Sequence, residues 1–140
     1  MEKRLIGMGL CALVVSGAVF AHSGATGIVK ERMDRFKESK QSIRALRGAI
    51  RDGDSATIDR LTGELAKWAA EIPDAFPANS NPPPSEARDR IWEDWQGFVD
   101  ASTEFEAAAL RLQNAGLSEQ AGALKALGAS CKACHQDYRQ

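Results

Sequence analysis

Four stretches of this sequence carry apolar residues at alternating intervals of three and four positions. They span residues 29–50, 58–72, 91–112 and 117–138. This spacing places apolar side chains along one face of a helix, and the positions between them are largely charged. No stretch shows the strict alternation that is typical of a β-strand. The pattern therefore predicts four amphipathic helices, with most aromatic side chains in the core between them.

Helix-breaking residues separate the four stretches. Asp52-Gly53-Asp54-Ser55 is predicted to end the first helix and to cap the second. Pro73 closes the second helix, and a proline-rich connector follows at residues 76–85. We expect Ser85 to cap the third helix, and residues 114–116 to form a tight turn before the fourth. Long amphipathic helices with short or moderate connections predict an all-α fold, an antiparallel four-helix bundle.

The first 21 residues have the features of a secretory signal. Lys3 and Arg4 precede an apolar run, and the run ends in a small-residue cleavage site at Ala21. We expect cleavage after Ala21, which leaves residues 22–140 as a single domain exported to the periplasm. The apolar run of about 15 residues is shorter than the ~20 that a spanning helix needs, so no stable membrane span is expected. A lipid-anchored start at Cys11 is disfavoured because Leu10 stands where a small residue is required.

Composition excludes two further classes of protein. The formal net charge of −1 argues against a nucleic-acid-binding protein, which needs a basic surface. The apolar share of 44% is too high for a disordered chain of such low net charge. Removal of the signal also removes Cys11, so the mature chain keeps only Cys131 and Cys134.

These two cysteines belong to the run Cys131-Lys132-Ala133-Cys134-His135, a Cys-x-x-Cys-His pattern that is typical of covalent haem attachment. Two thiols three residues apart on a helix face the same side and can add to both vinyl groups of one haem. His135 then supplies an axial ligand to the iron. We therefore expect one haem c per chain, attached covalently.

Three other interpretations of this run are weaker. A dithiol redox site would need a surrounding βαβ pattern, which the sequence lacks. A zinc site needs four ligands, and the mature chain offers only the two cysteines, His135 and the distant His22. A structural disulfide would leave His135 without a role.

The C-terminal run from residue 131 to 139 resembles the cytochrome c′ family, including its low-spin relatives with a methionine ligand. Members of that family carry the haem motif at the extreme C-terminus, with an aromatic and a basic residue three and four positions after the histidine. Tyr138 and Arg139 occupy those positions. Weaker similarities are residues 28–32, Phe76-Pro77, and Ile91-Trp92 with Phe98.

The resemblance implies a left-handed bundle with haem between the helices. Cys131 and Cys134 would be the thioether attachment points, and His135 would be a proximal ligand that is fairly exposed, with Arg139 close to it. Arg32, Phe36 and Arg139 would line the haem pocket.

The distal side of the haem depends on the first helix. In the low-spin relatives a methionine follows the helix-one arginine by four residues, whereas that position after Arg32 is Phe36. A phenyl ring cannot ligate iron, so Phe36 predicts a five-coordinate, high-spin haem open only to small diatomic gases such as NO or CO. Met33 lies one turn earlier on roughly the same face and is the alternative sixth ligand.

Two functions follow from these expectations. The first is one-electron transfer by a periplasmic c-type cytochrome, and the alternative is a five-coordinate haem protein that senses or sequesters NO or CO. No catalytic constellation is visible, so enzymatic activity is not expected. The sequence indicates no particular redox partner protein, and the resemblance allows a homodimer through the first two helices.

Overall fold

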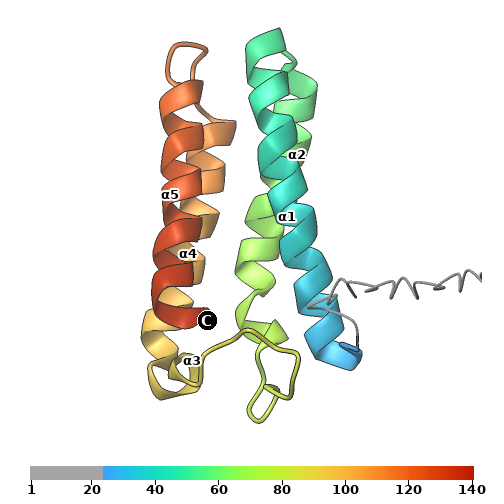
Figure 1. Ribbon diagram of the computed structural model, residues 1–140. Helices are drawn as coiled ribbons and strands as arrows, with labels where there is room; N and C mark the ends of the chain where they lie inside the picture. The colour runs from blue at the N-terminus through green and yellow to red at the C-terminus, as the bar shows by residue number, and fades with distance from the viewer. Residues whose placement is uncertain (1–23) are drawn as a thin grey trace, which may run out of the picture.

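The computed structural model describes residues 24–140 (Figure 1), and the expected signal sequence and its cleavage site lie outside this range. The described chain is helical, apart from one isolated antiparallel bridge between Ala87 and Arg139. The elements are α1 (Gly27–Asp52), α2 (Ser55–Glu71), the 3₁₀ turn η1 (Pro73–Ala75), α3 (Arg90–Glu93), α4 (Trp95–Gln113) and α5 (Gln120–Tyr138). The predicted all-α four-helix bundle is confirmed.

The four long helices form two antiparallel hairpins, α1 with α2 and α4 with α5 (Figure 1). The connector from η1 to α3 passes across one end of the bundle, where the C-terminus also lies. Helix α4 packs extensively against α2 and α5, and α1 packs against α2, whereas the contact between α1 and α5 is sparser. Of the described helices, none is long and apolar enough to cross a membrane.

The turn between α1 and α2 forms as the sequence predicts. Gly53 adopts a left-handed conformation with φ 69°, and its N–H donates to the carbonyls of Ala49 and Ile50. The side chain of Asp54 accepts a hydrogen bond of 3.0 Å from the Thr57 N–H, which lowers the pKa of that carboxyl. This turn sets α2 antiparallel to α1.

The third predicted helix differs from the structure at its start. Helix α3 begins at Arg90, and a break at Asp94 separates it from α4. Ser85 therefore caps no helix; its Oγ accepts hydrogen bonds from the Ala87 N–H (3.2 Å) and from Arg32 (2.8 Å). Because the break changes the helix phase, Trp95 is 41% exposed rather than a core residue.

The register of the last helix also differs from the prediction. Leu117 was expected on the buried face, but it lies in the turn before α5 and is 81% exposed. Leu127 is fully buried instead, and the buried face continues through Tyr138. The reason is that α5 begins only at Gln120, so an apolar residue in the preceding turn does not share its phase.

Candidate haem site

Cys131 and Cys134 lie half-buried on α5 as free thiols, with the exposed His135 next to them. Both sulfur-bearing side chains pack against the core of the bundle. Burial raises the pKa of Cys131, and burial together with the charges of Cys131 and Asp137 raises the pKa of Cys134 to about 11. Before any attachment chemistry, both groups are therefore protonated thiols at neutral pH.

Phe36 of α1 lies opposite this part of α5. Its ring centroid is 6.4 Å from that of His135, at an interplanar angle of 71°. The same ring meets Trp68 of α2 edge-on at 5.3 Å and Phe76 of the connector at 6.4 Å. Met33, one turn earlier on α1, is half-buried. The Phe36 ring therefore joins His135 to a cluster of aromatic rings from α2 and the connector.

Arg32 is buried beneath the connector, only 2% exposed. Its guanidinium donates to the carbonyl of Ala75 (3.2 Å), to both oxygens of Ser80 (3.0 and 2.7 Å) and to the Ser85 hydroxyl. It also stacks over the Phe76 ring at 4.3 Å. Burial lowers the pKa of Arg32. Within residues 24–140 these partners are all uncharged, so the bonds satisfy the N–H groups but leave the positive charge unbalanced.

Arg139 forms an ion pair with Glu86, in which its Nε lies 2.8 Å from the carboxylate. This pair influences His135. Partial desolvation of its ring lowers the pKa of His135, the charge of Arg139 lowers it further, and the charge of Glu86 raises it. The net direction favours the neutral imidazole, which is the form that can ligate iron.

These residues fit a haem on three counts. The half-buried thiols and apolar side chains between α1 and α5 match an apolar macrocycle with two attachment points. The unbalanced charge of Arg32 matches the carboxylates of haem. In addition, the buried indole N–H of Trp68 has no hydrogen-bond partner in the described part of the chain, although buried donors are nearly always paired. In contrast, no group of three or more His, Cys, Asp or Glu side chains converges within residues 24–140, as a zinc site would require.

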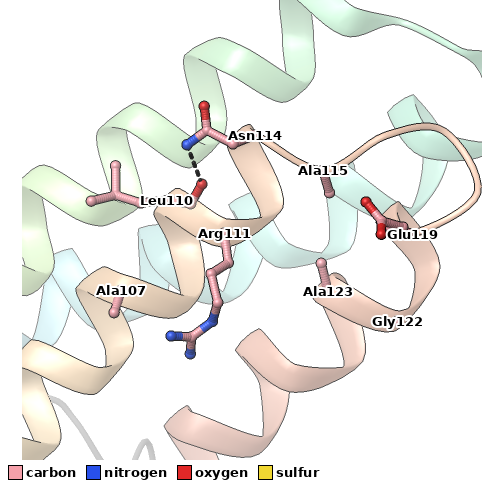
Figure 2. Close-up of a pocket in the computed structure, with 8 residues that line it drawn as sticks. All are labelled: Ala107, Leu110, Arg111, Asn114, Ala115, Glu119, Gly122 and Ala123. Carbon is pink, nitrogen blue, oxygen red and sulfur yellow. Dashed lines mark hydrogen bonds between the residues drawn. The ribbon is translucent and has the colours of Figure 1, made fainter.

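Two open pockets of the described structure lie away from the cysteines and His135. One of about 810 Å³ lies between the end of α4 and the start of α5, walled by Leu110, Arg111 and Glu119 (Figure 2). The other, of about 430 Å³, lies between the connector and Trp92 and Trp95. Neither of these two pockets is lined by the cysteines or His135.

Sequence reasoning missed Trp68 as more than a core residue, and it missed Ser80 and Glu86 altogether. Trp68 carries the apolar spacing of α2, which conceals the fact that its N–H lacks a partner. Ser80 and Glu86 lie in the connector, where no periodicity indicates which helix they contact. The position of Arg32 on an otherwise apolar face of the first helix was the one available indication that another segment supplies hydrogen-bond acceptors for it.

Comparison with known proteins identifies the family of this chain. The family model described as Cytochrome C' matches residues 27–139. The chain is 32% identical to cytochrome c-556 of Agrobacterium fabrum over 98% of its length and 94% of that protein, and 27% identical to cytochrome c' of Rhodospirillum rubrum over 99% of both. A nitric oxide complex of a mutant cytochrome c' from Alcaligenes xylosoxidans superimposes with a TM-score of 0.71 at 26% identity, covering 81% of this chain and 94% of that one. The chain therefore belongs to the cytochrome c′ family of c-type cytochromes, which bind haem c covalently.

Proposed function

We propose that this c-type cytochrome carries single electrons in the periplasm. The observation that carries the proposal is the place of the haem-binding residues. His135 is exposed and Cys131 and Cys134 are only half-buried, on the last turns of α5. A redox centre held there lies close to the protein surface, within reach of a partner protein. The haem supplies a reversible one-electron iron couple when it is bound.

Residues of the chain hold the haem and adjust its charge environment. Cys131 and Cys134 hold the cofactor through thioether bonds, and neutral His135 ligates the iron. The buried charge of Arg32 stabilises the anionic carboxylates of the haem, because a charge acts strongly where water is excluded. That charge also favours the reduced state, which carries one more electron.

A second candidate function is the binding of small gases. Phe36, rather than a methionine, faces His135 across the site. A phenyl ring cannot ligate iron, so Phe36 would leave this coordination position to an external diatomic ligand. The relative from Alcaligenes xylosoxidans has been obtained as a nitric oxide complex, which supports this candidate.

Absorption spectra of oxidised, reduced and CO-treated protein test both functions. We expect a high-spin, five-coordinate ferrous haem that binds CO and a reversible one-electron couple. The variant Phe36→Met should convert the spectrum to low-spin, whereas Met33→Leu should leave it unchanged. A low-spin wild-type spectrum that is lost in Met33→Leu would instead assign Met33 as the sixth ligand. Ferrous protein that binds neither CO nor NO would refute the gas-binding candidate, and the absence of a reversible one-electron couple would refute electron transfer.

Export is tested separately from haem chemistry. Cleavage after Ala21 predicts that protein purified from the periplasm starts at His22, which intact-mass measurement detects. Protein that retains residues 1–21 would contradict the cleaved signal.

A further inference from the structure

The last turn of α5 is fastened to the segment before α4. The Arg88 N–H donates to the carbonyl of Tyr138 (3.0 Å), and the Gln140 N–H donates to the carbonyl of Glu86 (2.9 Å). These backbone bonds hold the end of the helix that carries His135. They leave open what fixes the rotation of that turn about its axis.

The Arg88 side chain also donates to the Gln136 carbonyl (2.9 Å). A second side-chain hydrogen bond, from Tyr138, is placed to fix the rotation of the ring-bearing face. The buried Tyr138 donates its hydroxyl to Asp94 Oδ2 at 2.9 Å. Asp94 stands at the break between α3 and α4, where it also accepts an ion pair from Arg90 (3.5 Å). The bond therefore connects α5 to a fixed point on the neighbouring helix.

Gly97 provides the space for this bond. A Cβ at that position would lie 2.5 Å from the Tyr138 hydroxyl and 2.6 Å from Asp94 Oδ2, which no side chain can tolerate without a shift. Glycine inside a helix costs about 1 kcal/mol relative to alanine. Its presence in the first turn of α4 is explained by the close approach of these two side chains.

The Tyr138 ring is also joined to His135 through a chain of ring contacts. Tyr138 meets Phe98 at 5.3 Å, and Phe98 meets Phe76 at 5.0 Å. Phe76 meets Phe36 at 6.4 Å, and Phe36 meets His135 at 6.4 Å. His135 and Tyr138 are three residues apart on one turn, so rotating that turn moves both rings.

We propose that Asp94 is a positioning residue, which acts through Tyr138 in the space left by Gly97 to fix the orientation of the His135 imidazole. The inference rests on the proposed role of His135 as the haem ligand. Residues that orient a ligand change the electronic properties of the metal without touching it. A less well-directed imidazole donates less electron density, which favours the reduced iron.

The test uses the haem-loaded protein and measures its reduction potential and the spectrum of the histidine-ligated haem. Tyr138→Phe and Asp94→Ala should each raise the ratio of reduced to oxidised protein at a fixed solution potential by about two- to tenfold. The double variant should match Asp94→Ala, because Tyr138→Phe then removes a bond that is already lost. Asp94→Asn keeps an acceptor oxygen and should restore the wild-type ratio.

Ser102→Ala is the matched control. It removes another buried hydroxyl bond, from Ser102 of α4 to the Ala69 carbonyl of α2 (2.5 Å), which does not involve α5. It should lower stability and leave the ratio and the spectrum unchanged. If Asp94→Ala fails to fold, Gly97→Ala replaces it, because it crowds the bond without removing either partner.

The outcomes distinguish the positioning role of Asp94 from the haem-binding role of His135. A histidine-ligated haem whose ratio is the same in Tyr138→Phe and Asp94→Ala as in the wild type would overturn the positioning role alone. A shift of equal size in Ser102→Ala would also overturn it, by showing that general loosening suffices. Wild-type protein without a histidine-ligated haem would overturn the proposed function and the positioning role together.

Discussion

Replacement of Arg32 by methionine tests whether the connector depends on a buried charge. Methionine keeps most of the apolar stem but removes all four hydrogen bonds to Ala75, Ser80 and Ser85. The carbonyls of Ala75 and Ser80 and the Ser80 hydroxyl then lose this buried donor, whereas the Ser85 hydroxyl still accepts from the Ala87 N–H. We expect the bundle to lose stability through the connector rather than through its helical core.

The magnitude follows from opposing contributions. Hydrogen bonds with a charged donor contribute about 1.5–3 kcal/mol each. Removing the guanidinium also removes its desolvation cost, which amounts to several kcal/mol for a buried ion. The difference leaves a net loss of about 3 kcal/mol in the free energy of unfolding. For a domain of this size, that loss lowers Tm by about 10 °C.

Arg35→Met is the matched control for this measurement. Arg35 lies on the same helix and also stacks over an aromatic ring, that of Trp68 at 5.0 Å. It is partly exposed, however, and its ion pairs with Glu38 (3.7 Å) and Glu71 (3.3 Å) are at the surface. Such pairs contribute less than about 1 kcal/mol. Thermal unfolding of both haem-loaded variants, followed by circular dichroism, should show a much larger decrease for Arg32→Met. Equal decreases would refute the reasoning.

Three further predictions concern α5 and the turn before it. Burial, and next its bond to Asp94, raises the pKa of Tyr138, the single tyrosine in the sequence, to about 12. The folded protein therefore keeps a proton that the unfolded chain loses near about pH 10, so the free energy of unfolding falls as pH rises from 10 to 12. A phenolate titration near pH 10 in the folded protein would contradict this. In chemical denaturation, Leu127→Ala should lower the free energy of unfolding by about 2–5 kcal/mol and Leu117→Ala by less than about 0.5 kcal/mol. Equal losses would contradict the register of α5. Alkylation of Cys134 in the haem-free chain should be slow at neutral pH and accelerate toward pH 11, and rapid reaction at pH 7 would show an exposed thiol.

The sequence predicts the helices well where periodicity and punctuation agree. The large apolar side chains of residues 58–72 are all buried, and the turn at Gly53 forms as expected. Prediction fails where one apolar residue lies outside its helix, as Leu117 does, or where a helix breaks inside a continuous pattern, as at Asp94. Periodicity does not register such a break, because tertiary contacts such as the bond from Tyr138 stabilise it.

Some parts of the haem site can likewise be predicted from the sequence, and others cannot. The thiols and the imidazole lie on one continuous stretch of helix, so their spacing alone predicts their relation. The pairing of Phe36 with His135 depends on the rotation of α1, which spacing cannot determine. The acceptors of Arg32 lie 43 to 53 residues further along the chain, in a segment without a helical pattern. Only the folded chain reveals that contact.

The connector between η1 and α3 has a consequence for local opening. Arg32 near the start of the described chain and Tyr138 and Arg139 near its end both bind this one irregular segment. Segments of this kind usually open at little cost in free energy, because they have few buried partners. Here the segment can detach only when α1 and α5 both release it. Its opening therefore belongs to the cooperative unfolding of the whole bundle, and the region with the least regular backbone shares the stability of the core.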